Sequence, residues 1–295
     1  MYNLLFSRAG LSLERLRTFC EVADAGSMAK AANGDVVRQS QFSRQIKELE
    51  EHFGRKLTER SGRNVVLSAD GREFSALARQ ILSSLEDFQR GPATNGGDIH
   101  FGAGESFYVG VVLARLEQIR PRLGGATLAL RNLRGREIVA GLLDGKLDLG
   151  VIDESELAPG LDHVEIGRMR YRLVAPEGAV DEDGWRAAMR LPAVGMEGES
   201  RVMASFVNMA KRAGVELNFV VKCSSWISVA SVLSGSAFVG VLPNILEIPA
   251  VPREVTSPSM NAAGRKLVLA WDGRRGSLRA RSVSWRQVLE ETLRF

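Results

Sequence analysis

The stretch SMAKAANGDVVRQSQFSRQIKELEEHF spans residues 27–53 and decides the fold of the first part of this chain. Its pattern predicts two short helices around a turn at 33–35, where asparagine, glycine and aspartate interrupt the helical pattern. Four apolar residues of the second helix share one face: Phe42, Ile46, Leu49 and Phe53. They recur at i, i+4, i+7 and i+11, so we expect this face to pack on a small core.

The opposite face of that helix is polar. At about 100° per residue, Ser40, Arg44 and Lys47 fall opposite the apolar stripe. Arginine, glutamine and serine side chains read base edges and contact phosphates in a DNA major groove. An ordinary amphipathic surface helix has the same pattern, so this helix alone leaves DNA contact and plain solvent exposure as open alternatives.

The neighbouring segments favour DNA. Residues 12–26 predict a preceding helix, with Ser12 as its N-cap and Gly26 just after its end. Ser27 can cap the short second helix. Three helices with a tight turn between the second and third form a helix-turn-helix. Beyond Gly54, apolar residues on both sides of a Ser-Gly turn predict a short two-stranded wing with a local excess of basic residues.

The order and spacing of these elements resemble the winged helix-turn-helix of LysR-type transcriptional regulators, from Leu13 to about Phe88. The matching motifs are L-x-x-L-x-x-F from Leu13, A-x-x-G-S from Ala23, S-R-Q-I-x-x-L-E from Ser43, F-G-x-x-L from Phe53, E-R-x-G-R from Glu59 and V-x-L-S-x-x-G from Val65. The sequence departs from the family at Asp35, Arg38, Gln41 and Thr58. These departures concern the DNA sequence that would be read and the packing of the turn.

The resemblance implies contacts to double-stranded promoter or operator DNA from the third helix and the wing. The residues so implied are Arg38, Gln39, Ser40, Gln41, Ser43, Arg44 and Lys47 in the helix, with Arg60 and Arg63 in the wing. Arginine and lysine suit phosphates, and the amide and hydroxyl side chains suit base edges.

Composition agrees with this interpretation. A chain of 295 residues is long enough for two or three domains, and 45% apolar with 25% charged residues is ordinary for a globular protein. No apolar run is long enough for a membrane span. The 39 basic against 35 acidic residues permit nucleic acid as a partner without demanding it. The two cysteines, Cys20 and Cys223, offer no disulfide framework or metal spacing, which favours a reducing, cytoplasmic setting.

A long helix is predicted over 69–91. Its apolar residues follow a seven-residue repeat: Phe74, Ile81 and Phe88, with Ala78 and Leu85 between them. Such a seam packs either on a partner helix or on its own domain. This helix resembles the linker helix that pairs two subunits in the family, so the resemblance implies a homodimer or homotetramer. A glycine-rich and proline-containing stretch at 92–97 predicts a hinge.

Beyond the hinge, short apolar strands alternate with helical stretches, which predicts parallel sheets covered by helices. The predicted strands are Ile99–Ala103, Thr127–Leu130, Leu147–Ile152, Arg172–Ala175, Ala193–Met196, Asn218–Lys222, Ala237–Leu242 and Leu267–Trp271. The predicted helices are Ser106–Ile119, Arg134–Asp144, Ser200–Ala213, Ser225–Ser234 and Ser277–Arg294. The stretch 246–263 is rich in proline and is predicted as loop.

This half resembles the effector-binding region of the same family, which has the architecture of periplasmic binding proteins. Gly145–Ile152 and Gly240–Pro243 carry the resemblance. It implies an α/β domain over 98–295 with two subdomains, one from 98–166 and 269–295 and the other from 167–268. Crossing segments near Glu165–Arg168 and Lys266–Val268 would serve as hinges.

Ligands of open α/β sheets bind beyond the carboxyl ends of strands, near helix N-termini. Eight residues occupy such positions: Glu105, Ser106, Arg134, Glu199, Ser200, Arg201, Ser224 and Ser225. The serines at helix starts have a simpler alternative role as N-caps. We expect no cofactor or metal and a small-molecule effector whose charge is left open, and a pocket without any ligand stays an alternative.

Enzymatic function is not indicated, because the three histidines are dispersed and no G-x-S-x-G, phosphate-loop, H-E-x-x-H or C-x-x-C motif occurs. The sequence as a whole therefore predicts an α/β protein with a winged helix-turn-helix over 11–68, a dimerisation helix over 69–91, a hinge and an effector-binding domain. The predicted function is cytoplasmic transcription regulation, with RNA polymerase as a candidate partner and no membrane association. The alternatives are a solute-binding protein or enzyme on the C-terminal fold, and a DNA-bound regulator that senses nothing.

Overall fold

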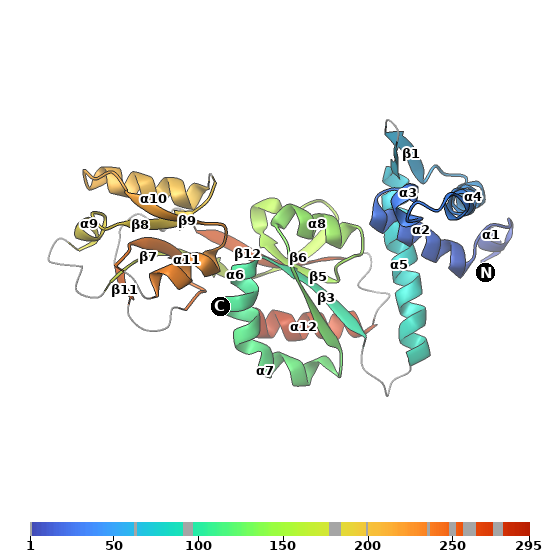
Figure 1. The fold of residues 1–295 in the computed structure, drawn as a ribbon. Helices are drawn as coiled ribbons and strands as arrows, with labels where there is room; N and C mark the ends of the chain where they lie inside the picture. The colour runs from blue at the N-terminus through green and yellow to red at the C-terminus, as the bar shows by residue number, and fades with distance from the viewer. Residues whose placement is uncertain are drawn as a thin grey trace.

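A computed structural model describes residues 2–61, 64–90, 97–176, 184–198, 200–234, 237–247, 252–255, 264–273 and 280–295. It has three parts: an N-terminal head of short helices and a wing, one long helix, and a C-terminal region of two α/β lobes (Figure 1). The predicted combination of a winged helix-turn-helix with a two-lobed α/β region is confirmed.

The head is built from α2 (Leu13–Ala25), α3 (Met28–Ala31) and α4 (Val36–Phe53), preceded by a short α1 (Asn3–Phe6) that the sequence did not predict. Each of the three main helices starts at a side-chain cap, because Ser12, Ser27 and Asp35 accept hydrogen bonds from the first-turn backbone N–H groups. Their shared core contains Leu16, Phe19, Val22, Phe42, Ile46 and Leu49. The predicted apolar stripe of α4 is thus buried.

The wing is a two-stranded antiparallel sheet of β1 (Thr58–Ser61) and β2 (Asn64–Leu67), as predicted. It packs closely on the start of α5 (Ala69–Arg90). Gly71 makes this approach possible, because a Cβ atom there would collide with the carbonyl oxygen of Leu57.

The first half of α5 belongs to the head. Phe74 and Ala78 are buried in the head core, where the rings of Phe74 and Phe19 meet edge to face with centroids 5.1 Å apart. The prediction that both residues join a seam facing another chain is therefore wrong. The apolar residues that α5 leaves exposed are Leu77, Ile81, Leu85 and Phe88, here called the exposed seam.

The first lobe is a five-stranded sheet in the order β4-β3-β5-β12-β6. Its strands are β3 (Asp98–Ala103), β4 (Thr127–Asn132), β5 (Leu149–Asp153), β6 (Leu161–Met169) and β12 (Arg265–Asp272). One face is covered by α8 (Gly135–Leu143), and the other by α7 (Leu116–Ile119) and α12 (Ala280–Leu293) (Figure 1). Between α6 (Glu105–Phe107) and α7 the chain continues through a π-helical turn, η1 (Tyr108–Val112), and a 3-10 turn, η2 (Leu113–Arg115).

The second lobe contains two smaller sheets. In one, β7 (Tyr171–Pro176) lies between β10 (Gly240–Pro243) and β11 (Pro252–Val255), and in the other β8 (Ala193–Met196) pairs with β9 (Phe219–Cys223). Its helices are α9 (Trp185–Ala188), α10 (Arg201–Arg212) and α11 (Trp226–Leu233).

The predicted elements of both lobes occur within a few residues of their predicted positions. Parallel sheets were predicted, but the five-stranded sheet is mixed and β10-β7-β11 is antiparallel, and only β8-β9 is parallel throughout. The sequence missed β6 and β11. The predicted crossing segments Glu165–Arg168 and Lys266–Val268 are parts of β6 and β12, where Lys266 pairs with Arg168 and Val268 with Glu165. The chain passes between the lobes just beyond these paired ends (Figure 1).

Candidate functional site

The outer face of α4 is polar and exposed. Ser40, Arg44 and Lys47 all lie on the solvent side, opposite the buried stripe, as the helical spacing predicts. The side chains of Arg44 and Lys47 are 83% and 73% exposed. This face can therefore meet a large, flat or grooved partner without any rearrangement of the head core.

Carboxylates one turn further along α4 partner these cations. The Nε of Arg44 lies 3.1 Å from Oε1 of Glu48, and Lys47 Nζ lies 3.7 Å from a Glu51 oxygen. Glu48 also accepts from Arg15 of α2, and the hydrogen bonds from Arg15 and Arg44 lower the pKa of Glu48. Exposed pairs of this kind contribute at most about 1 kcal/mol, so a phosphate or base edge can replace Glu48 as the partner of Arg44.

The remaining residues predicted to contact DNA do not all lie on the outer face of α4. Gln39, Gln41 and Ser43 are exposed on the flanks of the outer face. Arg38 does not join them, because its guanidinium lies 5.1 Å from the centroid of the Phe42 ring and pairs with Glu21 of α2 at 3.4 Å. Two further predicted contacts belong to the wing: Arg60 lies in β1, and Arg63 lies outside the described residues.

A buried carboxylate joins α4 to the wing. Glu50 is 8% exposed, and its Oε1 accepts hydrogen bonds at 3.0 Å from the backbone N–H groups of Leu57 and Thr58 and from the Thr58 hydroxyl. Its Oε2 lies 2.9 Å from Lys56 Nζ. Burial raises the pKa of Glu50, but these hydrogen bonds outweigh burial and hold the pKa below the usual value of 4.5. Glu50 thus fixes the wing relative to the outer face.

In the lobes, two of the predicted serines are N-caps. Ser200 accepts from the N–H of Met203, and Ser225 accepts from the N–H of Ser228, each at 3.2 Å. Ser106 is not a cap, because Gly104 occupies that position and Ser106 lies within α6. Arg134 occupies the N-cap position of α8, and its own N–H donates to Glu137 at 2.8 Å.

The other residues predicted to bind an effector lie near the N-termini of the same helices. Glu105 begins α6, Arg201 begins α10 and is exposed, and Ser224 is exposed before α11. Glu199 lies outside the described residues.

The lobes meet where α6 and α11 contact each other. The start of η1 packs tightly on the second lobe, since a Cβ at Gly110 would collide with the carbonyl oxygen of Ile245. The structure thus brings the elements of Ser106 and Ser225 to one boundary. The predicted effector residues do not line the cavity of about 920 Å³ or a smaller one of about 360 Å³, both of which lie elsewhere.

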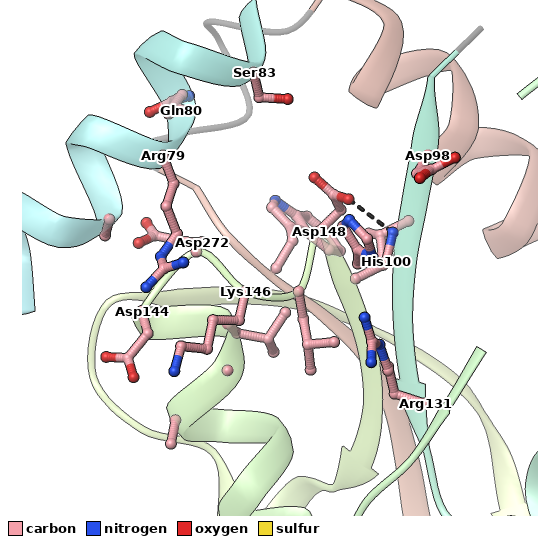
Figure 2. Close-up of a pocket in the computed structure, with 18 of the residues that line it drawn as sticks. Arg79, Gln80, Ser83, Asp98, His100, Arg131, Asp144, Lys146, Asp148 and Asp272 are labelled. Carbon is pink, nitrogen blue, oxygen red and sulfur yellow. Dashed lines mark hydrogen bonds between the residues drawn. The ribbon is translucent and has the colours of Figure 1, made fainter. Parts of the chain in front are cut away.

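The cavity of about 920 Å³ lies at the junction of the head, α5 and the first lobe. Figure 2 shows Arg79, Gln80 and Ser83 of α5 facing His100 of β3 and Lys146 of the loop after α8 across it. Asp24 of α2 joins the three parts, because its carboxylate lies 2.8 Å from Arg79 and 3.1 Å from Lys146. Burial raises the pKa of Asp24, but the bonds from Arg79 and Lys146 outweigh it and lower the pKa. Sequence reasoning missed this cluster.

Two further observations concern reactive groups and membranes. Cys20 is buried, and burial raises the pKa of its thiol to about 11. Within the described ranges, no cluster of histidine, cysteine and carboxylate side chains could hold a metal ion. None of the described helices combines the length and apolar character that crossing a bilayer requires.

Curated transcriptional regulators resemble part of this chain in sequence. The chain is 32% identical over 161 residues to the uncharacterized HTH-type transcriptional regulator YnfL of Escherichia coli (strain K12), covering 53% of this chain and 54% of that protein. It is 29% identical over 171 residues to a probable hydrogen peroxide-inducible genes activator of Mycobacterium xenopi, covering 57% of this chain and 90% of that protein. The matched part spans about half the length of YnfL.

Solved structures share the fold over nearly the whole chain. A full-length OxyR variant from Pseudomonas aeruginosa superposes with a TM-score of 0.61 at 17% identity, covering 96% of this chain and 98% of that chain. LysG from Corynebacterium glutamicum with bound effector Arg gives a TM-score of 0.60 at 18% identity, with 97% and 100% covered. CbnR complexed with its target DNA gives 0.53 at 20% identity, with 94% and 100% covered.

Family models match both halves of the chain. The model of the bacterial regulatory helix-turn-helix protein, lysR family, matches residues 13–72. The model of the LysR substrate binding domain matches residues 92–293, which is more than half of the chain. With a capped helix-turn-helix, a wing and a two-lobed α/β region in the same order, this chain belongs to the LysR family of bacterial regulatory proteins.

Proposed function

We propose that this protein is a sequence-specific transcriptional regulator that binds double-stranded promoter DNA and responds to a small molecule. The observation that carries the proposal is the outer face of α4, where exposed Ser40, Arg44 and Lys47 lie opposite a buried stripe. A reading helix needs this combination of a fixed inner face and free outer donors. The fold shared with CbnR in its complex with target DNA supports the same role.

Each part of the chain has a role in this proposal. Residues 11–68 bind DNA in the cytoplasm, 69–91 pair two chains through the exposed seam, and 92–97 form the hinge. Residues 98–295 bind the effector, with subdomains of 98–166 plus 269–295 and 167–268. A homodimer or homotetramer would set two copies of α4 on neighbouring half-sites. RNA polymerase is proposed as a further partner.

Effector binding is proposed at the boundary of the lobes. A ligand that contacts both lobes has different contacts in open and closed forms, and this difference lets it shift an equilibrium. The elements of Ser106 and Ser225 meet there from opposite lobes, and the backbone N–H groups near helix starts suit a polar ligand. The fold shared with LysG, which was solved with bound effector Arg, supports a small-molecule ligand for this chain.

Arg44 provides the test of DNA reading. The full chain first selects its preferred sequence from a pool of random double-stranded DNA. Arg44→Ala should then weaken binding to that sequence by about 1–3 kcal/mol, because a guanidinium contact to a base edge is lost. Arg212→Ala changes an exposed arginine of α10, outside the head, and should have no effect. Equal affinities of Arg44→Ala and wild type, measured at two salt concentrations, would contradict the proposed role of α4.

A second candidate function is a DNA-bound regulator without a ligand. It is favoured by the hydroxyls of Ser200 and Ser225, which already serve as helix caps. A screen of small molecules by thermal unfolding separates the two functions. An effector raises the unfolding temperature in proportion to its binding to the folded state, and a ligand-free regulator shows no such shift.

A further inference from the structure

The first turn of α4 exposes two adjacent apolar side chains. Val36 is 77% exposed and Val37 is 78% exposed, whereas Val22 of the same head is 3% exposed. Single exposed apolar residues are common on protein surfaces. Folding of α4 does not call for two neighbouring exposed valines in its first turn, because valine is a weaker helix former than alanine.

Helical geometry places both valines on the outer face. Val36 precedes Ser40 and Ser43 by four and seven residues, so these three side chains form one row. Val37 precedes Ser40 and Arg44 by three and seven residues, so it extends a second row. The second row lies opposite the buried stripe of α4 and the first lies beside it, and neither valine packs on the head core.

The start of α4 is also unsuited to a phosphate. Helix N-termini bind anions through free backbone N–H groups. Here the carboxylate of Asp35 already accepts from the N–H groups of Val37 at 2.8 Å and Arg38 at 3.1 Å. Its negative charge repels a DNA backbone at this end of the helix. The tip of α4 is therefore suited to a groove floor, where it offers apolar contact and few free donors.

Only one base presents an apolar group in the major groove, namely thymine with its C5-methyl group. We propose that Val36 and Val37 are specificity residues that recognise thymine methyl groups in the DNA sequence read by α4. This inference rests on the proposed DNA-binding function and adds the base that the first turn prefers. Burial of the methyl group between two valines removes apolar surface from water on both sides.

Uracil in place of thymine tests this directly, because uracil has the same hydrogen-bonding groups and lacks the methyl group. The full chain selects its sequence from random double-stranded DNA, and each thymine of that sequence is then replaced singly by uracil. We expect wild-type affinity to fall about three- to fivefold at one or two positions of each half-site, which is the scale of one buried methyl group.

Variants assign the effect to the two valines. The double variant Val36→Ala/Val37→Ala should lose most of the preference for thymine over uracil at those positions, because the shorter side chains bury less of the methyl group. Alanine is the best helix former, so α4 keeps its structure. Val220→Ala changes a 49% exposed valine of β9 and should keep the wild-type preference for thymine.

Three outcomes would overturn the inference. In the first, wild type binds every uracil-substituted sequence as tightly as the parent, so methyl groups are not read although DNA is. In the second, the double variant keeps the full thymine preference, so other residues read the methyl groups. In the third, no sequence is enriched by the wild-type chain, and the proposed DNA-binding function fails together with the inference.

Discussion

Both α4 and the helix starts of the lobes carry serine and arginine side chains, but they use them differently. On α4, Ser40 lies on an outer face where neither its own helix nor the head core needs its hydroxyl. In the lobes, Ser200 and Ser225 use their hydroxyls to cap α10 and α11. The same residue type therefore indicates a binding function on α4 and is explained by local structure in the lobes.

The difference teaches that a polar side chain is informative when folding does not require it. The outer face of α4 contributes nothing to the head core, so its composition reports on a partner. The lobes need their capping serines for folding, so these residues report on folding first.

The largest effect is expected in the exposed seam of α5, on which the proposed pairing of two chains depends. Ile81→Asp places a charge among Leu77, Leu85 and Phe88, so it should abolish oligomers and cooperative DNA binding. Ile81→Leu keeps the seam apolar and is the matched control. Sedimentation measures the oligomeric state. A wild-type chain that sediments as a monomer at micromolar concentration would contradict the proposed role of the seam.

Bulky side chains at the boundary between the lobes test the proposed effector site. Ser106→Phe and Ser225→Phe should each block the response to an effector and leave DNA binding without effector unchanged, because the bulky ring occupies the ligand space. Ser225→Thr keeps a capping hydroxyl and should respond normally. A reporter titrated with the effector measures this. A full response from both phenylalanine variants would place the effector elsewhere and leave these serines as structural residues alone.

The link between α4 and the wing should respond to mutation and to acid. Glu50→Ala leaves the N–H groups of Leu57 and Thr58 without their acceptor and should lower the free energy of unfolding by about 1–3 kcal/mol. Glu51→Ala, at a 66% exposed side chain, should change it by less than about 0.5 kcal/mol. Urea unfolding monitored on the head measures both variants.

The pH dependence follows from the lowered pKa of Glu50. A carboxylate whose folded pKa lies below its unfolded value of 4.5 contributes its full stabilisation above that value. The contribution is lost as the pH falls through the folded pKa. Wild type should therefore lose head stability in this acidic range, and Glu50→Ala should lose less of it. Parallel acid curves for the two proteins would show that Glu50 does not carry the effect.

The smallest effect is expected at the contact between the head and the first lobe. Asp24 and Lys146 are partly exposed, with side chains 52% and 39% accessible, so their pair should contribute only about 0.2–1 kcal/mol. A double-mutant cycle with Asp24→Asn and Lys146→Ala measures the coupling in the free energy of unfolding. A coupling of zero would mean that the head and the first lobe are not held together by this pair.

The sequence predicted the head well because its signals are local. Ser12 and Ser27 cap helices within three residues, and Gly26 and Gly54 end helices with a left-handed backbone. The strand β6 was missed because it is rich in polar residues and only partly buried. The strand β11 was missed because it begins at Pro252 in a segment that reads as loop.

The site was predicted less completely than the fold. Glu48, Glu50 and Glu51 look alike in the sequence, and only the folded wing selects Glu50 for burial. The family resemblance implied a DNA contact from Arg38, although its helical position lies beside Phe42. Asp24, Arg79 and Lys146 come from three separate segments, and no local pattern connects them.

The burial of Phe74 and Ala78 in the head core makes the head and α5 move as one rigid unit. The head cannot turn without α5, because these residues fix the first half of the helix to α2 and α4. With 22 residues, α5 is about 33 Å long at about 1.5 Å per residue. A tilt of about 10° at one end then moves the other end by about 6 Å, which approaches two base-pair steps of about 3.4 Å each. A small rotation near the lobes is in this way large enough to change the spacing between the two reading helices of a paired molecule.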